Sequence, residues 1–187
     1  MIERQKEFGI LRPIKDCELE LMLSWRNAAS VRENMYTTHE ISQSEHLAWW
    51  ERTKSSDRQR YFMYEFQDNP LGIVGFTDLD QGNRNSFWAF YASPTAPKGT
   101  GSRMEILALD YAFNDLGLHK LCCEVLAFNA PVIKLHEKFG FKVEGILRDQ
   151  YRREGSFIDI YRLGMLASEW AEARNAMISK LSRIFKG

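Results

Sequence analysis

Cysteine is scarce in this chain of 187 residues, which contains only Cys17, Cys122 and Cys123. Their number is odd, two of them are adjacent, and no Cys-x-x-Cys pair occurs. A disulfide framework or a zinc site would need more cysteines at other spacings, so we expect neither of these and no other metal site. We interpret the three thiols as small buried hydrophobic groups in a reducing cytoplasm.

Net charge is also missing, because Lys and Arg together number 25 and so do Asp and Glu. Without an overall field, nothing draws the protein to nucleic acid or to an anionic membrane. No uncharged run approaches the roughly 18 residues of a membrane helix, and the charged start leads into no apolar stretch of signal length. We therefore expect a cytoplasmic protein without nucleic-acid or membrane partners, which binds anionic ligands by a local arrangement of donors.

What is present is an ordinary globular composition, with 44% hydrophobic and 27% charged residues. This length predicts a single domain over residues 1–187, with a final helix over residues 166–185 as an appendage. Hydrophobic periodicity indicates the order β-α-α-β-β-β-α-β-α-β-β-α. That order predicts an α/β fold, a mixed sheet with helices on both faces.

The middle of the chain predicts an antiparallel meander. Its three strand-like runs cover residues 61–66, 71–77 and 86–91, and we expect Asn69-Pro70 and residues 81–85 to form the turns. After the meander, apolar residues recur at helical spacing from Met104 to Ala112. The pattern therefore changes from strands to alternating helices and strands.

A glycine-containing loop, Lys98-Gly-Thr-Gly-Ser-Arg103, stands where a strand leads into that helix. Glycines let successive backbone N–H groups converge, and the helix N-terminus adds partial positive charge, so such a loop can bind phosphate. It is not a Walker loop, because no Gly-Lys-Ser/Thr follows, and it lacks the third glycine of a dinucleotide fingerprint. Taken alone, a plain tight turn explains it equally well.

A second motif begins about 30 residues later and runs from Asn129 to Phe141. Its letters, Asn-Ala-Pro-Val-Ile-Lys-Leu-His-Glu-Lys-Phe-Gly-Phe, predict a helix that starts near a polar cap and ends at Gly140. Taken alone, this segment indicates only a capped helix.

The two motifs in this order, between strands, resemble the GNAT superfamily of Gcn5-related N-acetyltransferases from about Ile10 to Leu166. The resemblance implies an acyl-CoA N-acyltransferase fold with a mostly antiparallel central sheet, and acetyl-CoA as co-substrate. The family binds the coenzyme A pyrophosphate on the glycine loop and the pantetheine arm between two strands, here residues 87–92 and 120–127. Ala96 stands where the family usually has Arg or Gln, although Lys98 retains a cation. The implied cofactor-binding residues are Tyr91, Ala92, Lys98, Gly99, Thr100, Gly101, Ser102, Arg103 and Asn129.

The resemblance also assigns the catalytic residues of a direct transfer in a ternary complex. His136 stands where the family helix usually has a tyrosine that protonates the departing thiolate. A histidine can do so, because its reference pKa of about 6.5 lies below the roughly 8.5 of a thiol. The alternative, that His136 fills a core position on an apolar stripe, stays open. Glu124 is expected to accept the proton of the amine, directly or through water.

The N-terminal half resembles one GNAT branch, through the runs Trp25-Arg26-Asn27, Met35-Tyr36-Thr37 and His46-Leu47. Members of that branch acetylate the 4-amino group of a UDP-linked amino-dideoxy sugar in pseudaminic-acid synthesis for flagellin modification. The resemblance assigns the nucleotide to Arg26, His46, Thr77 and Tyr91. It assigns the sugar to Met35, Tyr36, Trp49, Phe87 and Glu124, with Trp49 in place of Phe and Phe87 in place of Tyr.

Physical chemistry is consistent with that acceptor, since Arg26 and His46 could meet a pyrophosphate through charge-assisted hydrogen bonds. Met35, Tyr36 and Trp49 suit the apolar face of a deoxy sugar. Other possibilities stay open: a GNAT enzyme that acetylates a protein N-terminus, a polyamine or an antibiotic amine, or a non-catalytic acyl-CoA-binding sensor. A homodimer is also left open.

Overall fold

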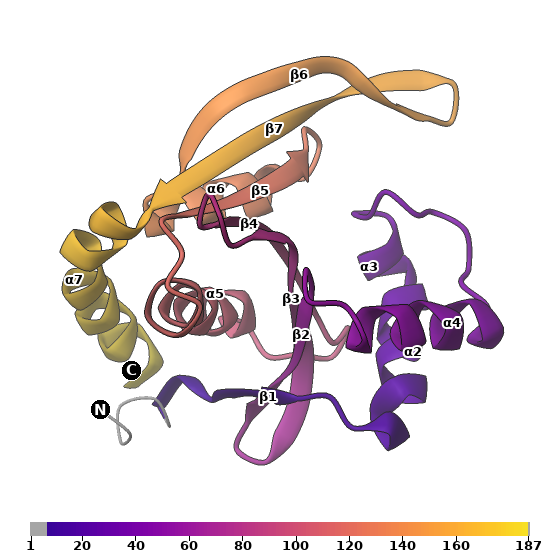
Figure 1. The fold of residues 1–187 in the computed structure, drawn as a ribbon, viewed down its shortest axis with the longest axis horizontal. Helices are drawn as coiled ribbons and strands as arrows, with labels where there is room; N and C mark the ends of the chain where they lie inside the picture. Colours follow the sequence, from indigo (N-terminus) through magenta and orange to yellow (C-terminus); the bar gives the residue numbers. More distant parts are fainter. Residues whose placement is uncertain (1–6, 187) are drawn as a thin grey trace. The chain divides into compact units, whose positions relative to one another are not determined.

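A computed structural model describes residues 7–186 (Figure 1). These residues fall into two compact units. The first unit consists of the chain up to Leu79 together with Trp88–Ala108. The second consists of Asp80–Phe87 together with the chain from Leu109 onward. Strand β4 (Asn85–Ala92) and helix α5 (Thr100–Asp110) are each shared between the two units.

The first unit holds the strands β1 to β4 in that order, with β1–β2 and β2–β3 antiparallel. Two helices of this unit, α2 and α4, supply the buried Met22, Trp25 and Trp50, which pack with Met63 and Ile73 of the sheet. The elements besides β4 and α5 are β1 (Ile10–Pro13), the 3-10 turn η1 (Asp16–Glu18), α2 (Leu19–Asn27), α3 (Ala29–Arg32), α4 (Gln43–Lys54), β2 (Arg60–Phe66) and β3 (Asn69–Asp80).

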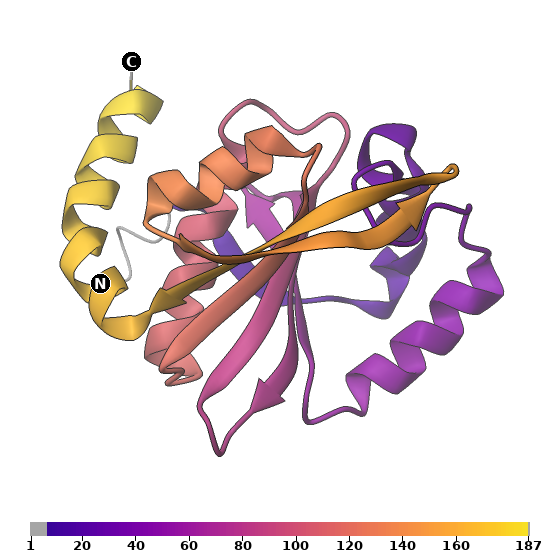
Figure 2. The same cartoon turned by 90° about the horizontal axis from the view of Figure 1, so that it is seen from above.

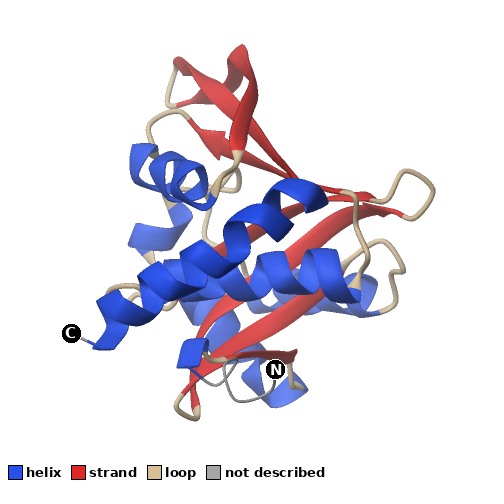
Figure 3. Ribbon diagram, turned by 90° about the vertical axis from the view of Figure 1, so that its left-hand side faces the viewer, coloured by secondary structure: helices blue, strands red, loops and turns tan. Residues whose placement is uncertain are grey.

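The second unit holds strands in the order β4-β5-β7-β6. The first three residues of β4 pair in parallel with Lys120–Cys122 of β5, whereas β5–β7 and β6–β7 are antiparallel. Strands β6 and β7 form a long two-stranded ribbon (Figure 2; red in Figure 3). The remaining elements are the π-helical turn η2 (Tyr111–Asp115), β5 (Lys120–Leu126), α6 (Ala130–Phe139), β6 (Lys142–Arg153), β7 (Ser156–Leu166) and α7 (Ala167–Lys186).

Helix α7 is fixed within the second unit by one buried carboxylate. Asp110 accepts hydrogen bonds from Trp170 Nε1 at 3.0 Å and from Nε and Nη2 of Arg174 at 2.6 and 2.7 Å. The bidentate contact raises the pKa of Arg174. The final helix is therefore attached by a charge-assisted contact as well as by apolar packing.

The predicted fold class is confirmed, since the structure is a mixed sheet flanked by helices. The predicted turn at Asn69-Pro70 is wrong, because these two residues begin strand β3 and the turn lies at Gln67-Asp68. Both turn residues have positive φ, 50° and 61°. A two-residue hairpin turn of this kind needs positive φ at both positions, whereas proline is held near −65°.

One helical segment also differs from the prediction. Helix α3 (Ala29–Arg32) was not predicted, because four residues are too few for a periodic pattern. Helix α4 begins at Gln43, and Ser42 is its N-cap, with Oγ accepting from the Glu45 N–H at 3.2 Å. None of the described helices is long and apolar enough to cross a membrane. The prediction of a single domain stays a prediction.

Candidate functional site

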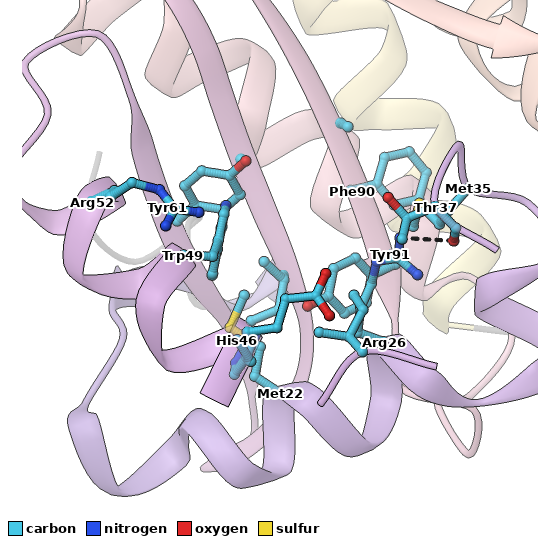
Figure 4. A pocket seen from close by; sticks show the side chains of 15 residues that line it. Met22, Arg26, Met35, Thr37, His46, Trp49, Arg52, Tyr61, Phe90 and Tyr91 are labelled. Carbon is cyan, nitrogen blue, oxygen red and sulfur yellow. Dashed lines mark hydrogen bonds between the residues drawn. The ribbon is translucent and has the colours of Figure 1, made fainter. Parts of the chain in front are cut away.

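The first unit contains a cavity of about 320 Å³, which we call the first-unit cavity (Figure 4). Helices α2 and α4, the segment after α3 and strands β2 to β4 all contribute to it. Its lining is mainly aromatic and aliphatic, with two arginines, one glutamate and one histidine. The lining residues are Met22, Arg26, Met35, Thr37, Ile41, Glu45, His46, Trp49, Arg52, Tyr61, Ile73, Gly75, Ala89, Phe90 and Tyr91.

Local periodicity brings these side chains to one place. On α2, Met22 and Arg26 are four residues apart and therefore share a helix face. On α4, Trp49 and Arg52 share a face for the same reason, because they are three residues apart. Ile73 and Gly75 are two residues apart on β3, and Ala89 and Tyr91 are two residues apart on β4. Because side chains of a strand point alternately to opposite faces, the two residues of each pair face the same side of the sheet.

Three buried polar atoms of this lining have no hydrogen-bond partner among the described residues. They are Nη1 of Arg26, Nε2 of His46 and the hydroxyl oxygen of Tyr91. A buried polar group without a partner costs about 1–3 kcal/mol, and native proteins leave few of them. Three such atoms in one cavity, from α2, α4 and β4, make this cavity the candidate site for a polar ligand.

The buried guanidinium of Arg26 makes the cavity suited to an anion. Its Nη2 donates to the Thr37 carbonyl at 3.3 Å, which Figure 4 shows as a dashed line. Burial lowers the pKa of Arg26, and the positive charge of Arg32 lowers it further. Burial also raises the pKa of Tyr91, so this phenol stays protonated and can donate as well as accept. A bound anion would relieve the desolvation of the guanidinium.

His46 offers a hydrogen-bond acceptor to the cavity, whereas Arg26 offers a donor. Burial lowers its pKa, while a hydrogen bond with the Leu19 backbone acts in the other direction. Since a backbone carbonyl can only accept, the ring nitrogen that meets Leu19 carries the proton, and Nε2 offers its lone pair to the cavity. The ring also stacks on Trp49, with centroids 5.4 Å apart. The cavity thus combines donors at Arg26 with an acceptor at His46.

Sequence reasoning missed two lining residues of the cavity, Arg52 and Tyr61. Arg52 has no carboxylate at ion-pair distance within the described chain, so a second cation is available to a ligand. The single lining carboxylate, Glu45, is already 3.1 Å from Nε2 of His39. Tyr61 packs edge-on against Trp49, with centroids 5.0 Å apart. The helical spacing from Trp49 to Arg52 is the signal that could have found the arginine.

The structure brings together five of the residues that the resemblance assigns to the acceptor: Arg26, Met35, His46, Trp49 and Tyr91. Tyr36, which is 46% exposed, and Thr77 on β3 belong to the same unit but are not among the lining residues of the first-unit cavity. Phe87 and Glu124 belong to the second unit. Their assignment to the acceptor stays a prediction.

The glycine loop has the backbone geometry that an anion site needs. Gly99 has a φ of 91°, in the left-handed region that favours glycine, and Thr100 Oγ1 donates to the Pro97 carbonyl at 2.8 Å. Helix α5 starts at Thr100, where the N–H groups of Thr100 and Arg103 donate to the Pro97 and Gly99 carbonyls at 3.2 and 3.1 Å. The N–H groups of Gly101 and Ser102, in the same first turn, have no acceptor inside the helix. Lys98 is exposed beside them. The loop therefore fits a pyrophosphate, as the resemblance implies.

Arg103 takes a structural position next to this loop. Its Nη1 donates to the Glu7 carbonyl at 2.6 Å, and its guanidinium lies 4.2 Å from the centre of the Phe66 ring. Burial lowers its pKa. Its side chain is thus engaged with the N-terminal segment and β2, and its predicted part in cofactor binding stays a prediction.

The predicted catalytic residues both lie in the second unit. Glu124 on β5 is paired with Arg162 on β7, whose Nη2 and Nε lie 2.5 and 3.1 Å from Oε1. His136 on α6 is only 3% exposed, and its ring centre is 5.3 Å from that of Phe141. Asn129 is the N-cap residue of α6. Such burial is what the core-filling alternative expects, so the role of His136 as the acid stays a prediction.

The three cysteines differ in exposure. Cys123 is buried and Cys122 half-buried, whereas Cys17 is exposed, so the expectation of a buried thiol is wrong for Cys17. All three are free thiols. Across residues 7–186, no cluster of three or more His, Cys, Asp or Glu side chains is arranged to hold a metal ion.

Known proteins resemble this chain in sequence and in fold. Residues 10–142 match the family model of the acetyltransferase (GNAT) domain. The SPbeta prophage-derived N-acetyltransferase YokL of Bacillus subtilis is 31% identical over 125 residues, covering 65% of this chain and 70% of the relative. Acetyltransferase PseH of Campylobacter jejuni is 25% identical over 134 residues, covering 72% and 83%.

Among solved structures, spermidine N-acetyltransferase from Vibrio cholerae in complex with CoA and spermine is similar, with a TM-score of 0.81 at 25% identity. The match covers 87% of this chain and 97% of that structure. In sequence, spermidine N(1)-acetyltransferase of Vibrio cholerae is 28% identical over 113 residues, which is 60% of this chain and 65% of the relative.

Proposed function

The chain belongs to the GNAT acetyltransferase family and is an acetyl-CoA-dependent N-acetyltransferase, and we propose that its acceptor is the amino group of a UDP-linked amino-dideoxy sugar. The co-substrate supplies the acetyl group as a thioester. The protein supplies the glycine loop for the coenzyme pyrophosphate and the first-unit cavity for the acceptor. The pathway of that sugar, pseudaminic-acid synthesis for flagellin modification, is part of the same proposal.

The observation that carries the proposal is the buried, unsatisfied Nη1 of Arg26 in an aromatic cavity. A nucleoside diphosphate offers the anion that this guanidinium lacks, and ribose or base N–H and O–H groups can donate to His46 Nε2. Trp49 and Tyr61 offer ring faces and edges to a sugar or base. At about 320 Å³ the cavity is within the range for small-molecule sites.

A polyamine is the second candidate, because the similar Vibrio cholerae enzyme is named for spermidine. The charge of the cavity argues against it. Polyamines are cations, and the lining has two arginines against one glutamate, which already contacts His39. Placing a cation beside an unpaired buried guanidinium would add repulsion to desolvation.

In the reaction, the lone pair of the amine attacks the thioester carbonyl, the C–N bond forms, and the C–S bond breaks to release the thiolate. The amine then loses a proton and the thiolate gains one. We propose Glu124 as the group that takes the first proton and His136 as the group that supplies the second. The pairing of Glu124 with Arg162 supports a role for this carboxylate as a fixed, oriented group.

Ligand-induced stabilisation tests the acceptor class. UDP should raise the melting temperature of the protein, whereas spermidine should not, since only a ligand that binds the folded state stabilises it. Arg26→Ala should lose the UDP shift, because a lost charge-assisted contact weakens binding by about one to two decades. Arg58→Ala is the matched control, since Arg58 is an exposed arginine of the same unit outside the cavity lining.

The opposite pattern would overturn the proposal. A wild-type protein that is stabilised by spermidine and unaffected by UDP would move the polyamine alternative into first place. If UDP does stabilise the wild type, acetyl transfer to a UDP-amino sugar can be measured next, by following the release of free CoA. Transfer to this acceptor would confirm the proposal.

A further inference from the structure

Tyr61 lies directly over Gly75 in the wall of the first-unit cavity. The two residues are register partners across the antiparallel strands β2 and β3. A Cβ atom on residue 75 would lie 2.4 Å from Cε1 of Tyr61, 2.8 Å from Cδ1 and 2.9 Å from Cζ. Observed Cβ contacts essentially never fall below 3.0 Å. The tyrosine ring thus occupies the space that any side chain at position 75 would need.

The backbone does not explain why residue 75 is glycine. Gly75 is absent from the glycines of the described chain that have positive φ, so its conformation is open to other residues. Glycine in the interior of a strand also carries an entropic cost and packs no side chain. What glycine provides here is a bare strand surface against which an aromatic ring can lie.

The Tyr61 ring also packs against Trp49. The two rings meet edge to face, with centroids 5.0 Å apart and planes at 88°. Trp49 is in turn stacked on His46. Strand β3 lies behind the tyrosine ring, and Gly75, Tyr61 and Trp49 all line the cavity. A side chain at position 75 would therefore force the ring away from the strand and into the cavity.

We propose that Gly75 is a specificity-determining residue that sets the size of the acceptor. By leaving its part of β3 bare, it lets Tyr61 lie flat and keeps the cavity wide enough for a bulky, ring-bearing acceptor. A methyl group at this position would narrow the cavity, exclude a nucleotide-linked sugar and still admit a thin linear amine. The inference rests on the proposed function in one respect, namely that the acceptor amine binds in the first-unit cavity.

The test compares Gly75→Ala with Gly145→Ala, a matched control. Gly145 is also a strand glycine, but a Cβ atom there would have no neighbour within 4 Å. For each variant, one measures the Kd for UDP, the KM for acetyl-CoA, and kcat/KM for ring-bearing and linear amines. Gly75→Ala should raise the Kd for UDP about tenfold or more and leave the KM for acetyl-CoA within about twofold. Gly145→Ala should resemble the wild type.

A double substitution tests whether the clash between the new methyl group and the Tyr61 ring causes the loss of affinity. In Gly75→Ala/Tyr61→Leu, the smaller, flexible side chain leaves room for the methyl group, so affinity for the bulky ligand should recover at least in part. If Gly75→Ala does not fold, Tyr61→Trp serves instead, because it enlarges the wall without touching the strand, and it should cause the same size-selective loss. The melting temperature of each variant separates loss of stability from loss of specificity.

Two results would overturn the proposal. One is a folded Gly75→Ala that binds UDP and turns over bulky amines like the wild type. The other is an equal loss toward ring-bearing and linear amines. Failure of the proposed function is distinct, because it shows as a wild type that does not bind UDP at all. In that case the ratio of kcat/KM between ring-bearing and linear amines still tests the role of Gly75.

Discussion

Arg162 and Glu124 are direct register partners across strands β7 and β5, and two guanidinium nitrogens of Arg162 donate to one oxygen of Glu124. The same guanidinium lies 5.4 Å from the centre of the Phe87 ring. Two residues that the family resemblance assigns to the acceptor are therefore joined by a third that the motifs did not single out. Contacts to one carboxylate oxygen from two donors fix the orientation of the group.

Removing the guanidinium of Arg162, which orients Glu124, should lower the rate of acetyl transfer without loss of cofactor binding. Arg162→Ala should lower kcat/KM for the amine about tenfold, and Glu124→Gln about a hundredfold, while the KM for acetyl-CoA stays unchanged. Arg162→Lys should recover part of the activity, because it keeps the charge but not the two-donor geometry. Arg152→Ala is the control, since Arg152 is exposed on the same hairpin. A fully active Arg162→Ala would refute this role.

The glycine loop predicts how cofactor binding can be abolished. Gly99 has positive φ, and a glutamate there would add backbone strain and a negative charge where the pyrophosphate is expected. Acetyl-CoA should raise the melting temperature of the wild type, and this shift should vanish in Gly99→Glu. Gly82→Glu, which places the same side chain in a surface turn, should keep the shift. If acetyl-CoA raises the melting temperature of a folded Gly99→Glu as much as that of the wild type, the glycine loop is not the pyrophosphate-binding site.

His136 can be tested by separating rate from stability. If it is the acid, His136→Ala should lower kcat about a hundredfold with little change in substrate affinity, and His136→Tyr should retain more activity. If it only fills the core, His136→Ala should lose thermal stability and keep near-normal turnover in the folded fraction, because a buried side chain leaves a cavity. Measuring kcat and melting temperature on the same samples distinguishes the two roles.

Acid should destabilise the protein through His46. Burial lowers its pKa in the folded state below the ordinary value of about 6.5. For a depressed pKa, the stabilisation is fully present above the unfolded value and is lost as the pH falls below about 6.5. Protonation would also turn the Nε2 acceptor into a donor and add a positive charge to a cavity that holds Arg26 and Arg52.

Melting temperatures at a series of pH values check this prediction. His46→Gln keeps a neutral polar side chain, so it should lose less stability than the wild type between about pH 6.5 and 5. His39→Gln, which changes an exposed histidine, should follow the wild type. An identical pH dependence in the wild type and His46→Gln would contradict the assignment.

Much of the fold was predictable because periodicity is a local property. The strand and helix order was predicted correctly, apart from the short α3. Helix α6 ends at Phe139, with Gly140 as its C-cap residue at a φ of 106°, as its sequence indicates. The hairpin at Gln67-Asp68 was not predictable, since both turn residues adopt positive φ without being glycine. Sheet pairing, rather than turn preference, holds them in that conformation.

The family and the co-substrate could be recognised from two contiguous segments, the glycine loop and Asn129–Phe141, because together they resemble the GNAT motifs. Tertiary packing was needed to bring Arg26, His46 and Tyr91 into one cavity with unsatisfied polar atoms, and to place the Tyr61 ring over Gly75. These residues come from segments far apart in the chain. Their desolvation and close contact arise from packing, which no local pattern encodes.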